Sequence, residues 1–176
     1  MLETFTKIEK RVGYFTKAIC YISFAGIIII VLLNVADVLM AKTYKPILGT
    51  YEITQRLLLC TVFASFAYTQ TKKGHINMTI LIAKFPRAVR FAFYTLTSIL
   101  SVFASGALTY AAFYQGGVSM SSNAATEVLY IPLYPFFYVQ ALAMAAFTIV
   151  LLFDAIMSVV AIFKDDVAKY IMDRWT

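Results

Sequence analysis

Four ionisable side chains lie within apolar stretches of the sequence, and they are the first candidates for chemistry. They are Asp37, Glu52, Arg56 and Asp154. At the centre of a membrane helix each such charge costs about 2.5–3.5 kcal/mol on insertion scales. A charge in that position is therefore typical of an ion, proton or substrate pathway, or of a pair that holds helices together.

Glu52 and Arg56 are four residues apart with the acid first, so they share one helix face and can form an ion pair. Glu52 also lies in the first turn of its expected helix, where the helix dipole favours an anion. Asp37 is near the end of the preceding apolar stretch, from which it could reach Arg56 or solvent. We interpret Asp37, Glu52 and Arg56 as a polar cluster for helix packing or partner contact. A substrate or ion site is the alternative.

Asp154 lies in an apolar stretch that covers about residues 133–163. As a helix this stretch would be ~46 Å long, which exceeds the ~30 Å hydrocarbon core of a bilayer. A count of about 20 residues from Pro135, the length that crosses a bilayer, already reaches Asp154. We therefore expect Asp154 near the inner interface rather than at mid-membrane, with a proton relay as the alternative.

Metal, haem and catalytic chemistry find little support in the residue types. The single histidine, His75, follows Gly74 at the end of an apolar stretch, whereas haem between membrane helices usually needs two axial ligands. Cys20 and Cys60 form neither a CxxC motif nor a zinc-ligand spacing. The sequence contains no GxSxG, HExxH or glycine-rich phosphate loop. We expect no catalytic residue, no metal site, no cofactor and no enzymatic activity.

The composition indicates that membrane helices position these residues. Hydrophobic residues make up 61% of the 176 residues and charged residues only 14%, with a mean hydropathy of +0.79. A soluble domain carries roughly 25% charged residues. The net charge of +6 does not indicate nucleic-acid binding, because the basic residues lie between apolar stretches rather than on one face with aromatic residues. We predict an all-α integral membrane protein that forms one membrane domain over residues 1–176.

Four apolar stretches are long enough to cross a bilayer as helices of about 20 residues. We predict four transmembrane helices, over about residues 18–39, 49–71, 88–114 and 133–163. The glycine- and serine-rich stretch that follows the third helix predicts a loop from Gln115 to Pro135. Pro86 is expected to begin the third helix, because a missing N–H costs little in the first turn.

Two further helices are expected at the membrane surface. Apolar residues recur at helical spacing before the first span and predict an N-terminal amphipathic helix on the inner leaflet, rather than a cleaved signal peptide. The residues that form this pattern are Leu2, Phe5, Ile8, Val12 and Phe15. Residues 76–85 are too short to cross the membrane and predict a short interfacial helix between spans 2 and 3.

The basic residues predict the orientation. Twelve of the 15 Lys and Arg residues fall before the first span, between the second and third, or after the fourth: Lys7, Lys10, Arg11, Lys17, Lys72, Lys73, Lys84, Arg87, Arg90, Lys164, Lys169 and Arg174. The opposite side has only Lys42 and Lys45. By the positive-inside rule both termini are cytoplasmic. Lys72, Lys73 and His75 then form a cytoplasmic interface anchor, in contact with membrane lipids.

One segment also carries a family resemblance. The second span opens with an acidic residue in "GTYEITQRLL" and closes on a basic pair and a histidine in "TKKGHINMTIL", and Pro132 in "LYIP" precedes the fourth span. With four spans and both termini inside, the chain resembles the small membrane subunit of tripartite ATP-independent periplasmic (TRAP) transporters, the DctQ-type family. It departs from the family pattern at Thr79, where an acidic residue often stands, and at Lys42, near an arginine that often ends the first span.

The resemblance implies a function that the residues alone do not. Such subunits pair with a large multi-span membrane subunit that carries the substrate and sodium sites, and a periplasmic substrate-binding protein delivers an organic acid. The small subunit is then an accessory scaffold of a sodium-coupled secondary transporter in the bacterial inner membrane. The alternatives are a self-sufficient small proton-coupled exporter and a membrane anchor subunit of a respiratory complex that binds haem or quinone.

Overall fold

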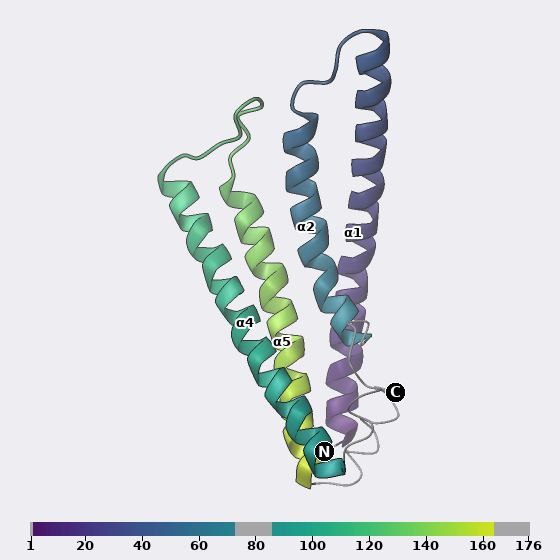
Figure 1. Ribbon diagram of the computed structural model, residues 1–176, viewed down its shortest axis with the longest axis vertical. Coiled ribbons are helices and arrows are strands. Elements are labelled where there is room, and N and C mark those ends of the chain that lie inside the picture. The colour runs from purple at the N-terminus through teal and green to yellow at the C-terminus, as the bar shows by residue number, and fades with distance from the viewer. Residues whose placement is uncertain (1, 73–85, 164–176) are drawn as a thin grey trace.

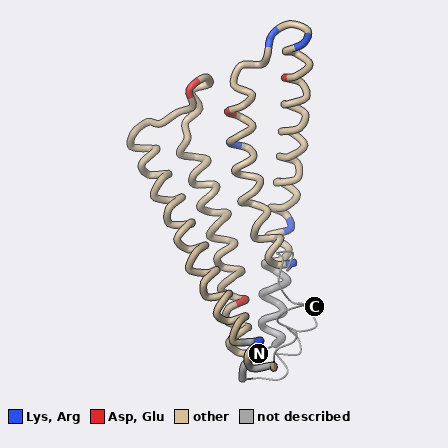
Figure 2. The backbone as a smooth tube through the Cα atoms, viewed as in Figure 1, with Lys and Arg blue, Asp and Glu red and all other residues tan. Residues whose placement is uncertain are grey.

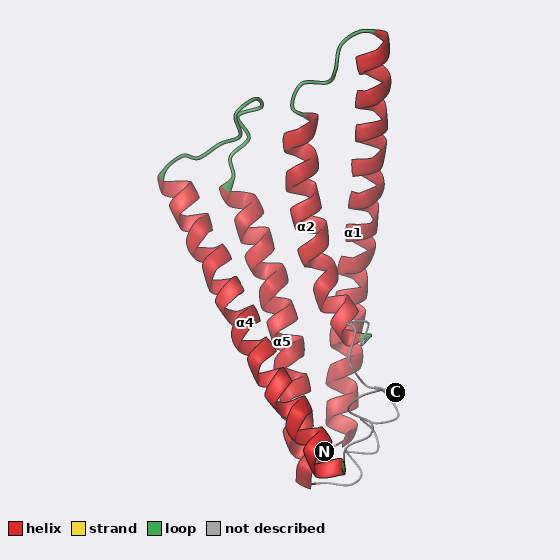
Figure 3. Cartoon of the chain, viewed as in Figure 1, coloured by secondary structure: helices red, strands yellow, loops and turns green. Residues whose placement is uncertain are grey.

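The computed structural model describes residues 2–72 and 86–163, which form four helices and, within those ranges, no strand (Figures 1 and 3). The helices are α1 (Leu2–Thr43), α2 (Thr50–Thr71), α4 (Arg87–Ser121) and α5 (Tyr134–Phe163). The all-α prediction is thereby confirmed for the described residues. The interfacial helix expected over 76–85 lies outside them, as do Lys73 and His75.

Two helices match their predicted spans almost to the residue, and two are longer. α2 and α5 each begin one residue later than expected and end where expected. α1 is one unbroken helix from Leu2, so the expected amphipathic segment and first span are continuous; no proline interrupts them before Pro46. α4 begins directly after Pro86, as predicted, but continues seven residues beyond its predicted end to Ser121.

The extra turns of α4 correct the predicted start of the third loop. Gly116 is buried, and a Cβ there would approach the Tyr138 ring to 3.1 Å. The Phe113 ring also packs edge-on against Tyr138, with centroids 5.5 Å apart. Contact with α5 therefore keeps α4 helical through the pair Gly116 and Gly117, despite the low helix propensity of glycine.

The four helices lie side by side in the order α1, α2, α5, α4 (Figure 1). α2 packs on α1 and on α5, and α5 packs on α4. The α1–α2 loop and the α4–α5 loop lie at the same end of this layer, called the loop end below. α5 supplies most of the buried apolar side chains of the described chain, including Met144, Leu151 and Ala161.

Small and polar side chains make the contacts between helices. A Cβ on Gly26 of α1 would overlap the Thr61 side chain of α2, so glycine allows these two backbones to approach closely. The Asn34 amide donates to Thr54 Oγ1 across the same pair at 2.9 Å. Between α4 and α5, the Thr109 and Thr148 hydroxyls lie 3.3 Å apart. Such contacts are typical of helix packing in a bilayer, where apolar burial contributes little.

Three of the four helices are long and apolar enough to cross a membrane: α1 over Thr16–Thr43, α4 over Ala92–Ser121 and α5 over Tyr134–Ala161. α2 is less apolar, because it carries Glu52, Arg56 and Gln70, and its crossing stays a prediction. Figure 2 shows that the charged residues of the described chain lie mostly towards the helix ends. Large apolar side chains such as Phe103 and Leu142 are exposed along the helices between these ends.

Candidate functional site

The α4–α5 loop folds into a tight hairpin, called the α4–α5 hairpin below (residues 122–133). The Leu133 N–H donates to the Ala124 carbonyl at 3.0 Å, and the Thr126 N–H donates to the Ile131 carbonyl at 2.9 Å. The Ile131 N–H in turn donates to Thr126 Oγ1 at 3.0 Å, and Thr126 is only 6% exposed. Thr126 thus organises the hairpin from within, which leaves the amides at its tip free to bind elsewhere.

Glu52 binds the tip of this hairpin. One carboxylate oxygen accepts a hydrogen bond from the Val128 N–H at 2.8 Å, and the other accepts one from the Leu129 N–H at 3.0 Å. Two neighbouring N–H groups that face one carboxylate form a small anion-binding pocket of backbone dipoles. The first turn of α2 is thereby fastened to a loop 77 residues away in the sequence.

Gly49 makes room for this contact. It precedes α2 with φ 82°, a left-handed backbone that favours glycine. A Cβ at position 49 would overlap the side chain of Leu129, the residue whose amide binds Glu52. The sequence Gly49-Thr-Tyr-Glu52 therefore supplies both the space and the acceptor that hold the α4–α5 hairpin against α2.

Asp37 has a separate role at the same end of the molecule. Its Oδ1 accepts a hydrogen bond from the Ile47 N–H at 2.6 Å, which ties the α1–α2 loop back to α1. The Thr50 hydroxyl donates to the Ile47 carbonyl at 2.9 Å, and Thr50 is buried. Asp37 and Glu52 thus each bind backbone amides at the loop end. Asp37 binds within the α1–α2 pair, and Glu52 binds across to the α4–α5 pair.

The ion pair expected between Glu52 and Arg56 is not formed among the described residues, because both Glu52 oxygens face the hairpin amides. Asp37 likewise contacts Ile47 rather than Arg56. The Arg56 Nε is buried and has no hydrogen-bond partner within the described part of the chain. The local spacing suggested a pair within one helix, whereas the backbone amides of a distant loop are better placed to satisfy the carboxylate.

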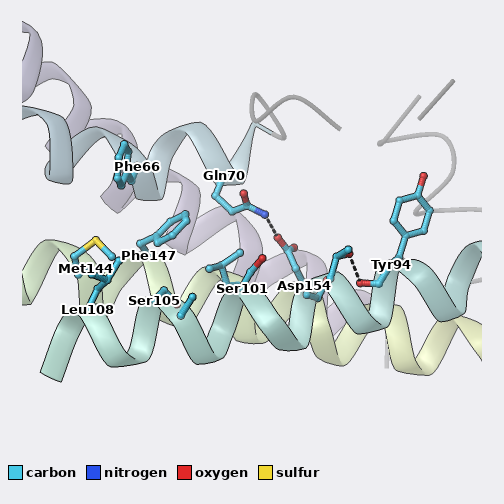
Figure 4. A pocket seen from close by; sticks show the side chains of 13 residues that line it. Phe66, Gln70, Tyr94, Ser101, Ser105, Leu108, Met144, Phe147 and Asp154 are labelled. Carbon is cyan, nitrogen blue, oxygen red and sulfur yellow. Dashed lines mark hydrogen bonds between the residues drawn. The ribbon is translucent and has the colours of Figure 1, made fainter. Parts of the chain in front are cut away.

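A second polar site lies towards the other end of the layer, where α2 and α5 approach one another (Figure 4). The Gln70 side-chain amide donates to Asp154 Oδ2 at 2.6 Å. The Phe66 and Phe147 rings pack beside this contact, with centroids 5.8 Å apart. Asp154 is 20 residues after Tyr134, ~30 Å along α5, and its expected position near the inner interface stays a prediction.

The sequence analysis missed the hydrogen-bond partners of Glu52 and of Asp154. Val128 and Leu129, which bind Glu52, gave no signal, because a backbone N–H carries no sequence information. Gln70 did give one, since it is a polar residue near the end of α2 and an acid within apolar surroundings requires a donor. The spacing that placed Glu52 in the first turn of α2 is confirmed.

The other predicted site residues lie at the end of α2 or beyond it. Lys72 follows the last turn, is exposed, and donates its backbone N–H to the Tyr68 carbonyl at 3.1 Å. Its predicted companions Lys73 and His75 lie outside the described residues. Within residues 2–72 and 86–163 no three His, Cys, Asp or Glu side chains gather as metal ligands would.

A comparison with known protein families identifies the family of the chain. The family model described as "Tripartite ATP-independent periplasmic transporters, DctQ component" matches residues 30–161, about three quarters of the chain. No curated protein and no solved structure matches the chain. The matched region includes Asp37, Glu52 and Asp154 and the α4–α5 hairpin. The chain therefore belongs to the DctQ family, the small membrane component of TRAP transporters.

Proposed function

We propose that this chain is the accessory scaffold subunit of a sodium-coupled, binding-protein-dependent transporter that imports an organic acid. It acts with a large multi-span membrane subunit, and a periplasmic substrate-binding protein delivers the substrate to the pair. The family match over residues 30–161 is the observation that carries this proposal, because DctQ components belong to transporters assembled from several proteins.

The shape of the described chain supports a scaffold role. A single layer of four helices buries few of its own side chains. In the most apolar stretch of α1 only 6% of the residues are buried, and in that of α4 only 11%. The remaining apolar surface must contact lipid or another membrane protein. A thin, wide layer of this kind is suited to extend the surface of a larger partner within the bilayer.

The orientation that we propose is four spans with both termini in the cytoplasm. The 12-to-2 distribution of basic residues supports it. α2 is included as a span because its 22 residues measure ~33 Å and because it packs between α1 and α5, both long and apolar enough to cross. The loop end then faces the periplasm, on the side from which a binding protein would approach.

The charged residues at the two ends have separate proposed roles. At the periplasmic end, Asp37, Glu52 and Arg56 serve helix packing and partner contact, since the two acids fasten the two loops. At the cytoplasmic end, Lys72, Lys73 and His75 anchor the chain against lipid head groups. Neither group is proposed to bind the transported substrate.

A reconstituted uptake assay tests the function. Proteoliposomes would contain the large subunit with or without this chain, and uptake of a labelled organic acid would be followed with the binding protein and an inward sodium gradient. We expect uptake only when all components and sodium are present. Full uptake without this chain would contradict the proposal, as would proton-driven movement by the chain alone, which would indicate the exporter. A Soret band of the purified chain would indicate the respiratory anchor.

A further inference from the structure

Arg56 is a cation within α2, away from both ends of the helix. It follows Thr50, the first residue of α2, by six residues, which is ~9 Å along the helix axis. Its side chain is partly exposed, but its Nε–H is buried and meets no acceptor within residues 2–72 and 86–163. A guanidinium stays charged in proteins, so in the proposed span this residue requires an anion close by.

The two acids that were expected to pair with Arg56 bind backbone amides instead. Both Glu52 oxygens accept N–H groups of the α4–α5 hairpin, and Asp37 accepts the Ile47 N–H. Lys72, where the described part of α2 ends, is 16 residues or ~24 Å from Arg56 along the helix. The structure thus divides the predicted polar cluster: its acids hold the loops of the chain, and its arginine is available to another molecule.

We propose that Arg56 forms an ion pair with an aspartate or glutamate of the large membrane subunit, within the bilayer and near its periplasmic side. This inference rests on the proposed function. A planar guanidinium binds a carboxylate through two parallel hydrogen bonds, which is why arginine is favoured in ion pairs at interfaces. In apolar surroundings such a pair also fixes the position of one chain against the other, since either charge alone is costly there.

Arg56 lies on the side of α2 that faces the α4–α5 pair. Glu52, one turn earlier on this side, binds the α4–α5 hairpin. Phe63, two turns later, contacts the Phe66 ring, which packs against Phe147 of α5. Because the helices form a single layer, a membrane helix laid across one face of the layer can reach the partly exposed Arg56 side chain (Figure 1).

A protein carboxylate fits this position better than a lipid phosphate. In the proposed orientation the 22 residues of α2 cross the ~30 Å hydrocarbon core, so Arg56 lies inside the core while the phosphates lie outside it. An arginine that binds a phosphate from this depth extends its side chain to the membrane surface. The buried Nε instead places the Arg56 side chain against other protein atoms. A membrane helix can carry a carboxylate to that depth, whereas a lipid head group stays at the surface.

Co-purification tests the ion pair. With affinity-tagged large subunit as bait, Arg56→Gln is expected to lower the amount of co-purified chain about tenfold, as removal of one member of a desolvated ion pair does. Arg56→Lys keeps the charge but not the two parallel hydrogen bonds, so its yield should be intermediate. Lys45→Gln, which removes an exposed cation in the α1–α2 loop, is the matched control and should leave the yield unchanged. Undiminished co-purification of Arg56→Gln would overturn the proposal.

The stability of the isolated chain separates a partner contact from an internal one. Arg56→Gln is expected to keep or raise the melting temperature of the isolated chain in detergent, because within the described residues the buried Nε–H has no acceptor to lose. Glu127→Gln, which removes the exposed acid of the α4–α5 hairpin, should leave the yield of the complex unchanged. A lower melting temperature for Arg56→Gln would assign Arg56 to an internal contact and overturn the proposal.

Charge reversal identifies the partner residue. Arg56→Glu should lower the yield of the complex further than Arg56→Gln, because two like charges then meet. Each acid in the membrane helices of the large subunit would be replaced by arginine in turn, and one replacement is expected to restore the complex with Arg56→Glu. Restoration by none of them would overturn the carboxylate as the partner. If Arg56→Gln assembles fully but carries less phospholipid, measured as phosphate per complex, the anion is a lipid and the proposal is wrong.

The outcomes separate this inference from the proposed function. If the wild-type chain does not co-purify with the large subunit at all, the scaffold function fails and the ion pair fails with it. If wild type and Arg56→Gln form the complex equally and transport equally, only the ion pair is wrong. If Arg56→Gln assembles fully but raises the KM for the organic acid, Arg56 binds substrate, and the ion pair with the large subunit is again wrong.

Discussion

The Glu52 carboxylate accepts the backbone N–H of Leu129 at 3.0 Å, although 77 residues separate the two in the sequence. Through this bond and its companion from Val128, the first turn of α2 is joined to the α4–α5 hairpin. The α1–α2 pair and the α4–α5 pair are thus connected at the loop end, in addition to the packing of α2 on α5. An acid that the spacing assigns to its own helix serves instead to connect two helix pairs.

Glu52→Ala is expected to release the hairpin and lower the thermal stability of the purified chain by about 3 °C or more. Glu52→Gln keeps the shape but loses the charge and can accept at only one oxygen, so its effect should be intermediate. Melting temperatures in detergent would measure both, with Glu127→Gln as the control for loss of a nearby acid. A Glu52→Ala chain that melts like wild type would show that the contact adds no stability.

Gly49→Ala is expected to destabilise the protein by about 1–3 kcal/mol, because φ 82° strains any residue with a Cβ. The added methyl group also overlaps Leu129. The double variant Gly49→Ala/Leu129→Ala should recover the steric part but not the backbone strain. Gly117→Ala is the matched control, since a Cβ there meets nothing within 4 Å and helix propensity should make it neutral or stabilising. Equal melting temperatures for the variants at 49 and 117 would contradict this account.

Gly26→Val is expected to separate α1 from α2, because the larger side chain meets Thr61. A disulfide between Asn34→Cys and Thr54→Cys, whose native side chains are hydrogen-bonded at 2.9 Å, would report the helix separation. In a background with Cys20 and Cys60 replaced by alanine, oxidation should form this disulfide readily when position 26 is glycine and poorly in the Gly26→Val variant. Gly106→Val on α4, where a Cβ meets nothing within 4 Å, should not affect it.

The proposed orientation predicts which positions a membrane-impermeant maleimide can reach. In the same cysteine-free background, Lys45→Cys and Ser122→Cys at the loop end should be labelled in intact spheroplasts. Lys72→Cys, beyond the other end of α2, should be labelled only after permeabilisation. Labelling of position 72 in intact spheroplasts would reverse the orientation or exclude α2 as a span.

Replacement of Lys72 and Lys73 by alanine removes two of the twelve basic residues on the proposed cytoplasmic side. We expect partial loss of uniform orientation and weaker contact with anionic lipid, with no change in the apparent affinity for substrate. The maleimide assay measures the first effect and the uptake assay the last. A change in substrate affinity without a change in orientation would assign these lysines to the transport site instead.

The sequence by itself determined that the chain forms long helices and where most of them begin. Apolar length and composition act locally, and proline ends or begins a helix wherever it stands, so α2 and α5 could be predicted within one residue and the start of α4 from Pro86. The family motifs around Glu52 could also be read directly, and the family match confirms what they indicated.

Only the tertiary structure decided what those helices do with their polar residues. The order α1, α2, α5, α4 and the length of α4 depend on contacts such as Gly116 with Tyr138, which are distant in the sequence. The Glu52–Arg56 spacing suggested an ion pair within one helix, but backbone amides of the α4–α5 hairpin donate hydrogen bonds to both Glu52 oxygens. The sequence does not indicate which backbone amides will be available, because every residue except proline has one. Gln70 and Asp154 are 84 residues apart, and their hydrogen bond likewise forms only because α2 packs on α5.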